Sequence, residues 1–250
     1  MRPMGQPVVR VQGENPMPLE ALIFDVDGTL AETEELHRQA FNEAFGEFGL
    51  DWHWSMDDYR VLLRTTGGKE RIRAHAETIG KTLDDDFIRE LHARKTERYG
   101  ELMASGAITL RPGIEELIAE AAVSGIRLAI ATTTSRPNVD ALIRAACGRE
   151  AQGIFEVIAA GDEVAAKKPA PDVYQLALRR LGLDASRCIA LEDSANGLKS
   201  ALAAGLQTIV SPGHYTNGED FSGALCVIAD YGTLSIDEVI GILDTVPEPA

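Results

Sequence analysis

The chain has 250 residues, of which 45% are hydrophobic, enough for the core of one large domain or of one domain with a smaller insert. Its 24 Lys and Arg stand against 39 Asp and Glu, and this formal net charge of −15 argues against a nucleic-acid or anionic-membrane partner. An anionic small substrate is not excluded, because salt screens charges over roughly 8 Å and nearby lysines decide the field of a pocket. No apolar run reaches the length of a membrane span.

Residues 1–18 are expected to form a disordered leader, because they are rich in proline and lack the continuous apolar segment of a signal peptide. Residues 247–250 are expected to be a frayed tail. The three cysteines (Cys147, Cys188 and Cys226) are widely spaced, which predicts buried, unpaired thiols in a reducing compartment and a cytoplasmic location. We expect a monomer.

The apolar run Ala21–Phe24 predicts a buried strand, and Asp25 and Asp27 follow where a parallel strand would end. Because side chains alternate along a strand, both carboxylates should point to the same side. Two like charges placed together are costly unless a cation or a proton divides them, and ligands bind at this edge of open α/β sheets. An Asp-Gly turn alone would be structural, but the whole sequence Phe-Asp-Val-Asp-Gly-Thr favours a functional site.

An amphipathic helix is predicted next, ending near Phe48, and Gly49 is a natural stop for it. Glu34 and His37 are three residues apart in this helix and therefore share a face. They are either a solvated pair or part of the same cleft as the two aspartates.

Residues 50–106 show only helical patterns, whereas strand patterns alternate with helices from Leu110 onward. A helical block inserted after the first strand of an α/β pattern predicts a lid domain. The predicted fold is therefore α/β, with a Rossmann-like parallel sheet as the core and an inserted all-helical cap. The predicted boundaries are residues 19–32 and 107–246 for the core and residues 33–106 for the cap.

Two basic features lie in the predicted cap. A glycine-rich loop opens a helix, and its free N–H groups and lysine suit an anion, although such a loop is also a common helix–helix turn. His92 and Lys95 share one face of the last long cap helix, which indicates either a solvated surface or an anion site. The loop residues are Thr65, Thr66, Gly67, Gly68 and Lys69.

The apolar segment Ile126–Ala131 predicts a second core strand, and Thr132–Ser135 follow at its carboxyl end. Pro137 then opens a helix. Hydroxyls and N–H groups at a strand-to-helix junction suit a phosphate, although these hydroxyls can equally be helix caps.

Phe155–Ile158 predicts a short strand, and Lys168 then precedes a proline in Lys-Pro-Ala-Pro-Asp. Cys188–Leu191 predicts a further strand, which ends at the acidic pair Glu192 and Asp193. Hard oxygen ligands of this kind suit Mg²⁺. The remaining predicted elements are strands at Leu206–Val210 and Leu225–Ile228 and a closing helix at Ile236–Leu243.

These four polar segments, in this order, resemble the four motifs of the haloacid dehalogenase-like hydrolases, and the resemblance covers most of the chain. It implies that Asp25 attacks phosphorus, that Asp27 is a general acid and base, and that Lys168 neutralises the phosphate. It also implies that Thr132 binds the phosphate. The implied Mg²⁺ ligands are Asp25, Asp27 (through its carboxylate or its backbone carbonyl) and Asp193, with Glu192 nearby.

The stretches Thr-Leu-Ala-Glu-Thr-Glu-Glu-Leu-His, Thr-Thr-Gly-Gly-Lys-Glu-Arg-Ile and Ala-Leu-Glu-Asp-Ser-Ala-Asn-Gly resemble the CbbY-type phosphatases more closely. This group, in the β-phosphoglucomutase and phosphoglycolate phosphatase branch, occurs with Calvin-cycle genes and hydrolyses xylulose-1,5-bisphosphate, a Rubisco inhibitor. The resemblance implies a small sugar bisphosphate as the substrate. The implied substrate-binding residues are Glu34, His37, Thr65, Thr66, Gly67, Gly68, Lys69, His92, Lys95, Thr132, Thr133, Thr134, Ser135, Arg136 and Asn138.

Other functions stay open from the sequence. A β-phosphoglucomutase of the same branch would return the phosphoryl group to a sugar instead of water, and a phosphoglycolate phosphatase would use a smaller substrate. A haloacid dehalogenase would not need Asp27, Lys168 and Asp193 as a set for metal and phosphate. A phosphosugar-binding module without activity is expected to have lost the nucleophile, whereas Asp25 is present.

Overall fold

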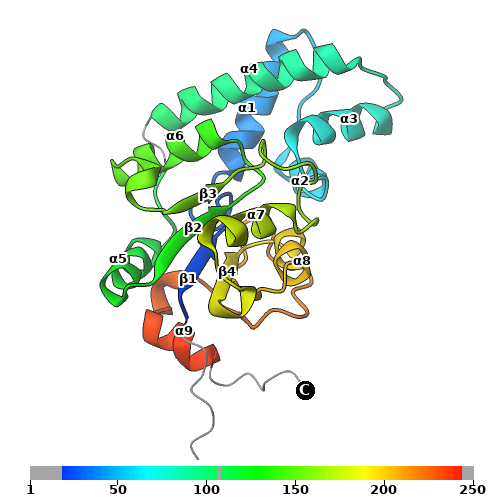
Figure 1. Cartoon of the computed structure of the whole chain (residues 1–250). Helices are drawn as coiled ribbons and strands as arrows, with labels where there is room; N and C mark the ends of the chain where they lie inside the picture. Colours follow the sequence, from blue (N-terminus) through cyan, green and yellow to red (C-terminus); the bar gives the residue numbers. More distant parts are fainter. Residues whose placement is uncertain (1–18, 106–107, 244–250) are drawn as a thin grey trace, which may run out of the picture.

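A computed structural model of the chain describes residues 19–105 and 108–243. The predicted leader and tail, and the predicted boundary between residues 106 and 107, lie outside the described residues. Six strands form one parallel sheet in the order β3-β2-β1-β4-β5-β6 (Figure 1). The strands are β1 (Ala21–Phe24), β2 (Arg127–Ala131), β3 (Val157–Ala159), β4 (Cys188–Glu192), β5 (Gln207–Val210) and β6 (Cys226–Val227).

Strand β1 lies inside the sheet, where it pairs with β2 on one side and β4 on the other. Ile23 stands opposite Ala129 and Ala190 in these two pairings. The chain runs outward from β1 to β3 and then returns to β4, so the strand order reverses between β1 and β4. Ligands of such sheets bind at the carboxyl ends of the strands beside this reversal. Asp25 and Asp193 directly follow these two strands.

Helices cover both faces of the sheet, which explains why its strands are apolar runs without polar alternation. Leu22 and Phe24 of β1 pack toward α5, α6 and α9 on one face. Ala21 and Ile23 pack toward α7 and α8 on the other. The predicted Rossmann-like α/β class is confirmed. The helices are α5 (Ile114–Ser124), α6 (Arg136–Cys147), α7 (Asp172–Leu181), α8 (Ala195–Ala203) and α9 (Ile236–Leu243).

Four helices follow β1 in the chain and stand together above the sheet in Figure 1. We call them the helical insert: α1 (Glu34–Glu47), α2 (Met56–Leu62), α3 (Gly68–Thr78) and α4 (Asp85–Ala104). The insert has its own buried aromatic cluster, which includes Phe41, Phe45, Trp54 and Tyr59. The predicted helical segments are thus present, and the domain boundaries at residues 33 and 106 stay a prediction.

Two expectations are corrected. The strand predicted at Phe155–Ile158 begins two residues later, because the N–H of Phe155 donates to Ala151 and closes a turn, while its ring packs edge-on against Phe24. The three cysteines are free, as predicted, but Cys188 is buried and the other two are half-buried. The 3-10 helices, which were not predicted, are η1 (Ala151–Gly153), η2 (Ala185–Arg187) and η3 (Tyr231–Thr233).

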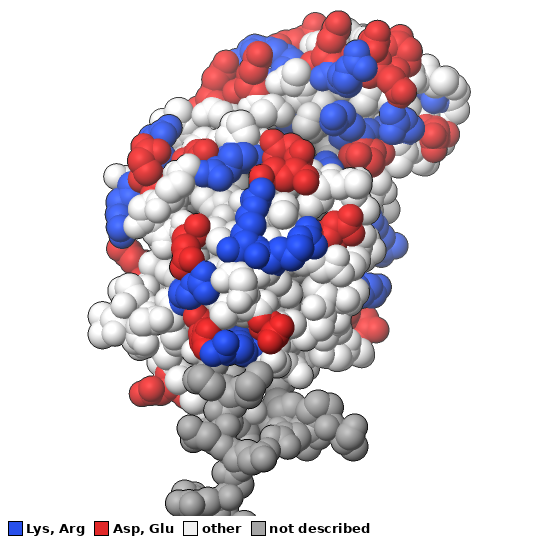
Figure 2. Space-filling view, in the orientation of Figure 1, with Lys and Arg blue, Asp and Glu red and all other residues white. Residues whose placement is uncertain are grey.

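On the face shown in Figure 2, basic and acidic side chains lie beside one another over both the insert and the core. Ion pairs such as Arg127 with Glu156 and Arg180 with Glu163 place opposite charges beside one another in the core. Among the described residues, no helix is both long and apolar enough to cross a membrane.

Candidate active site

A cavity of about 370 Å³ lies where the carboxyl edge of the sheet faces the helical insert. This volume falls in the range of small-molecule sites. Core and insert both contribute to its wall. Of the predicted site residues, those that line it are Asp25, Asp27, Glu34, His37, Thr66, Gly67, Gly68, Lys69, His92, Lys95, Thr133, Thr134, Ser135, Asn138, Lys168 and Asp193.

Lys168 is buried at the core end of the cavity, between two carboxylates. Its Nζ lies 2.5 Å from Asp25 Oδ1 and 2.6 Å from Glu192 Oε1, and the hydroxyl of Tyr174 also donates to Glu192 over 2.6 Å. Burial alone would lower the pKa of Lys168, but Asp25 and Glu192 hold it above its ordinary value. The lysine is therefore a fixed positive charge beside Asp25.

Three carboxylates lie close together here, and two of them, Asp25 and Glu192, contact the Lys168 ammonium. Oxygens of Asp25, Glu192 and Asp193 lie within 4.8 Å of one another. Burial raises the pKa of Asp193 well above its ordinary value, and repulsion from Asp25 and Glu192 raises it further. The pKa of Asp25 is also raised by burial and by neighbouring carboxylates, against the opposing effect of Lys168. A cluster with this charge excess and with hard oxygen donors fits a divalent cation.

Asp25 and Asp193 face the cavity, whereas Glu192 is fully buried behind them. The turn after β1 allows this close approach, because Gly28 has a φ of +88° and a Cβ at this position would collide with the Asp193 carboxylate. Glycine is therefore required here both for the backbone conformation and for space.

Asp27 lies outside the acidic cluster, and its carboxylate faces the insert. Its Oδ1 accepts a hydrogen bond from the Thr33 hydroxyl at 2.5 Å and lies 3.2 Å from His37 Nε2. The Nδ1 of His37 lies 2.6 Å from Lys95 Nζ. A carboxylate only accepts, so Nε2–H of the neutral His37 ring donates to Asp27, and Nδ1 is left to accept from Lys95. If Asp27 holds a metal, the engagement of its carboxylate leaves the backbone carbonyl for that role.

The charges along this chain of hydrogen bonds follow from burial and proximity. Burial lowers the pKa of Lys95 to about 7, with a further contribution from Arg71. Burial and Lys95 lower the pKa of His37, which keeps this ring neutral at pH 7. Burial would raise the pKa of Asp27, but His37 and Thr33 hold it below its ordinary value. Asp27 is thus a carboxylate in this structure.

The loop after β2 forms one side of the cavity. Thr133, Thr134 and Ser135 line it, together with Asn138 in α6. Thr132 does not, because it is 1% exposed and its hydroxyl accepts a hydrogen bond from the N–H of Thr134. Its hydroxyl therefore shapes the turn. Arg136, also absent from the cavity wall, pairs with Asp140 at 3.1 Å.

The glycine-rich loop of the insert forms the opposite side. Gly67 has a φ of +97°, and a Cβ on Gly68 would collide with the ring of His92. These glycines bring backbone N–H groups at the start of α3 against the cavity. Thr65 does not line the cavity, and its carbonyl accepts a hydrogen bond from Arg71.

The interpretation of His92 and Lys95 as a solvated basic patch is wrong for Lys95, which is 5% exposed and turned inward. Burial and the neighbouring Lys95 also lower the pKa of His92 to about 3. Both residues face the cavity from α4. A basic group held inward without a carboxylate partner has the placement of an anion ligand.

Sequence reasoning missed Arg71. It is 8% exposed, lines the cavity, and donates through NH1 to the Tyr59 hydroxyl at 2.7 Å. That hydroxyl in turn donates to Glu34 at 3.0 Å. The sequence did contain a signal that Arg71 could face the site, because it is one helical turn from the glycine loop and adjoins the apolar Ile72. Other cavity residues that were missed are Lys167, Asn196 and Thr216.

The chain is similar to known proteins over most of its length. Residues 19–205 match the family described as haloacid dehalogenase-like hydrolase. Protein CbbY of Rhodobacter capsulatus is 63% identical over 208 residues, which are 83% of this chain and 92% of that protein.

Two solved structures have the same architecture. CbbY from Rhodobacter sphaeroides in complex with phosphate superposes with a TM-score of 0.83 at 55% identity, covering 90% of this chain and 99% of that one. A mutant of the same protein in complex with xylulose-(1,5)bisphosphate gives a TM-score of 0.82 at 57% identity, with coverages of 86% and 96%.

Proposed function

Because the chain belongs to the haloacid dehalogenase-like hydrolase family, we propose that it is a phosphatase that removes one phosphate from a sugar bisphosphate. The proposed substrate is xylulose-1,5-bisphosphate, and the product is xylulose 5-phosphate. The observation that carries the proposal is a cavity with two different ends. Lys168 and the acidic cluster form the core end. At the insert end are Lys69, Arg71 and Lys95, which form no ion pair with a carboxylate of the described residues. The relative crystallised with xylulose-(1,5)bisphosphate supports the choice of substrate.

At the core end, Asp25 is the proposed nucleophile. A carboxylate oxygen of Asp25 forms a bond to phosphorus while the bond between phosphorus and the sugar oxygen breaks, which leaves an aspartyl-phosphate. Lys168, 2.5 Å from Asp25, offsets the negative charge of the phosphoryl oxygens and lets two anions approach.

Asp27 is the proposed general acid and base. An approaching phosphate dianion disfavours the ionised form of a nearby carboxylate, so it raises the low pKa of Asp27 and favours uptake of a proton. Asp27 then protonates the leaving sugar oxygen. In the second step it takes a proton from the water that attacks the aspartyl-phosphate and releases inorganic phosphate.

Mg²⁺ is the proposed cofactor. The cavity-facing carboxylates of Asp25 and Asp193 and the backbone carbonyl of Asp27 would hold it, with Glu192 behind them. When bound, the ion supplies Lewis-acid neutralisation of phosphoryl oxygens. The raised pKa values of Asp25 and Asp193 support a cation here, because a positive charge would relieve the repulsion between them.

The insert end would hold the second, non-reacting phosphate. Lys69, Arg71, His92 and Lys95 surround this end, and the N–H groups that open α3 add further donors. Binding energy from the distal phosphate helps to align the reacting one. Glu34, which accepts a hydrogen bond from Tyr59, would contact the sugar hydroxyls.

With this substrate the enzyme would remove an inhibitor of Rubisco. The resemblance behind the choice of substrate also implies association with the Calvin cycle and a cytoplasmic location. We also propose that the protein acts as a monomer.

Release of inorganic phosphate from a panel of substrates with Mg²⁺ present tests the proposal. The panel contains xylulose-1,5-bisphosphate, other sugar bisphosphates, sugar monophosphates and phosphoglycolate. We expect the highest kcat/KM on xylulose-1,5-bisphosphate and no turnover by Asp25→Asn, because an amide is a poor nucleophile. A preference for phosphoglycolate, or conversion of β-glucose 1-phosphate to glucose 6-phosphate at a higher rate, would replace this proposal by one of the other functions of the branch.

A further inference from the structure

The loop Pro212–Asn217, which follows β5, contacts both the acidic cluster and the helical insert. Thr216, 7% exposed, donates its hydroxyl proton to Asp193 Oδ2 over 3.1 Å. The N–H of Gly213 donates to the same hydroxyl over 2.8 Å. This second contact uses a lone pair of the hydroxyl, and the other acceptor within reach of its proton, the Gly213 carbonyl, is farther away than Asp193, at 3.4 Å. Thr216 is therefore built to orient that carboxylate.

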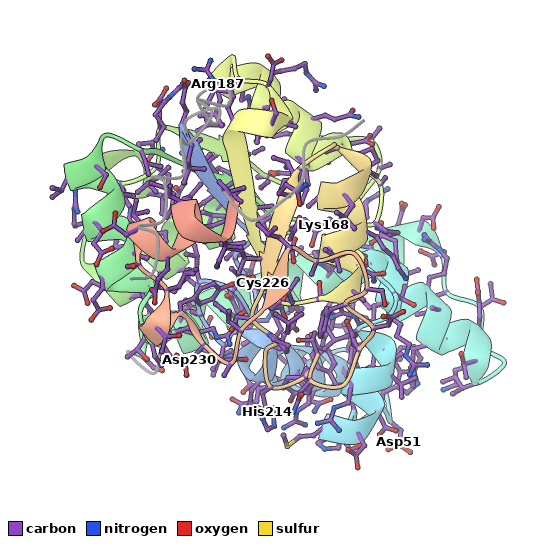
Figure 3. All side chains as sticks on the ribbon, turned by 90° about the horizontal axis from the view of Figure 1, so that it is seen from below. Asp51, Lys168, Arg187, His214, Cys226 and Asp230 are labelled. Carbon is purple, nitrogen blue, oxygen red and sulfur yellow. The ribbon has the colours of Figure 1, made fainter. Side chains whose placement is uncertain are left out.

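Tyr215, the neighbour of Thr216, belongs to the aromatic cluster of the insert although it comes from the core. It is 5% exposed, and its ring lies edge-on to Tyr59 with 5.8 Å between centroids. Its hydroxyl donates to Glu35 over 2.6 Å, in the first turn of α1. Figure 3 labels His214 where the loop meets the ribbon of the insert, and the N–H of His214 contacts Glu32 at 3.3 Å.

The base of the loop is fixed to the core by a buried arginine. Arg111 is 8% exposed and donates to the carbonyls of Ser211 and Pro212 at 2.8 and 3.1 Å. It also donates to the carbonyl of Gly28, in the turn that carries Asp25 and Asp27. The loop is thus held at its base by the core and at its tip by the insert, with Thr216 between the two anchors.

We propose that the loop Pro212–Asn217 positions Asp193 for the metal and makes this positioning depend on the seating of the helical insert. Thr216 orients the carboxylate, and Tyr215 is the anchor that the insert holds. The inference deepens the proposed function and rests on it only for the identity of the cation. A displaced insert would pull on Tyr215, move Thr216 and loosen Asp193, so cation affinity would be highest when the insert is seated over the cavity.

Calorimetric titration of the full chain with Mg²⁺ tests whether Thr216 positions Asp193 for the cation. Thr216→Val keeps the shape of the side chain and removes the donor, and we expect it to weaken Mg²⁺ binding about 10- to 100-fold, the usual effect of losing an outer-shell partner. Thr216→Ser keeps the hydroxyl and should restore affinity to within about threefold. Thr208→Val is the matched control, because Thr208 is a buried threonine of β5 whose hydroxyl contacts only a backbone carbonyl.

The coupling to the helical insert is tested with Tyr215→Ala. This variant removes the anchor and leaves the three carboxylates of the acidic cluster unchanged. We expect Mg²⁺ binding to weaken about tenfold. Trp52→Leu is its control, because Trp52 is buried in the same aromatic cluster and its ring packs edge-on against Phe45 and His75 of the insert. It should lower the melting temperature and leave Mg²⁺ affinity unchanged.

Wild-type affinity in Thr216→Val would overturn the role of Thr216. Equal affinities of Tyr215→Ala and Trp52→Leu would overturn the coupling to the insert. The Mg²⁺ affinities of these variants relative to wild type do not depend on the results of the substrate panel. If the protein binds Mg²⁺ but hydrolyses no sugar bisphosphate, the proposed function is refuted, and the titrations still test the role of the loop.

Discussion

The two aspartates of the first motif are separated by a single residue and yet have different surroundings. Asp25 lies beside Lys168 within the acidic cluster, whereas Asp27 turns toward Thr33 and His37 of the insert side. Environments that differ in this way give two carboxylates two chemical roles. The geometry supports the division into a nucleophile and an acid–base group.

Replacement of Asp27 by Asn tests the acid role. An amide cannot protonate the leaving oxygen, so we expect a rate loss of about 10²- to 10⁴-fold on a sugar phosphate. The loss should be much smaller on an aryl phosphate, whose leaving group needs no proton. Measured kcat values on both substrate types decide the matter, and equal losses would argue against the acid role.

Lys95 gives a prediction on pH and stability. Its pKa is about 7 in the folded chain against an ordinary value of 10.5, so between these limits the unfolded chain binds a proton that the folded chain does not. The free energy of unfolding therefore rises with pH across this window, by up to about 1.4 kcal/mol per pH unit from this group. Below pH 7 both states carry the proton and the contribution is constant.

Lys95→Met removes this titration and keeps the apolar stem. The unfolding free energy of wild type minus that of the variant, from urea denaturation at a series of pH values, should increase from about pH 7 to about pH 10. Groups away from Lys95 titrate alike in both proteins and cancel, and His37 and His92, whose pKa values Lys95 lowers, have ordinary pKa values below this window. A difference that does not change with pH would show that Lys95 is solvated and charged throughout.

At the scale of elements, helix α3 and its glycine loop are the proposed source of bisphosphate specificity. Lys69 lines the cavity from the first turn of α3. We expect Lys69→Ala to lower kcat/KM on a bisphosphate by roughly 10- to 150-fold, since a charge-assisted contact to phosphate is worth about 1.5–3 kcal/mol. Part of the loss should fall on kcat, because distal binding energy aligns the reacting phosphate.

Arg73→Ala is the matched control, because Arg73 lies one turn farther along α3 and pairs with Asp85 at the surface. It should change kcat/KM by less than about threefold. On a short monophosphate, Lys69→Ala should behave like this control. Equal losses from Lys69→Ala on both substrates would remove the case for a distal phosphate and leave the phosphatase core standing.

At the scale of the whole molecule, the acidic cluster links stability to the cation. Free Mg²⁺ at a hundred times its dissociation constant should add about 2.7 kcal/mol to the free energy of unfolding. For a chain of this size that raises the melting temperature by about 5–10 °C, and a chelator should reverse the rise.

Asp193→Asn separates this effect from general salt. The variant removes a buried carboxylate whose pKa burial and neighbours raise, so without Mg²⁺ it should melt at or above the wild-type temperature. Addition of Mg²⁺ should raise the melting temperature of this variant only slightly. Asp51→Asn, an exposed carboxylate of the insert labelled in Figure 3, should respond like wild type. An equal Mg²⁺ response in both variants would place the cation outside the cluster.

The local sequence determined the strands of the core and the polar residues at the carboxyl edge of the sheet. Each strand of the sheet is a short apolar run buried on both faces, and residues such as Asp25 and Asp193 directly follow a strand. Parallel strands bring their carboxyl ends to one edge, so residues more than a hundred positions apart could be predicted to meet. The helices of the insert could also be predicted, from the periodicity of their apolar residues.

Only the tertiary structure decided which polar residues of the insert turn inward. Glu34 and His37 had two equally good interpretations, and Lys95 and Arg71 have the spacing of ordinary solvated helix residues. Tyr215 comes from a core loop and packs into the insert. A helical period shows which residues share a face, but what that face meets depends on how insert and core pack together. That packing involves contacts between distant segments, which no local pattern contains.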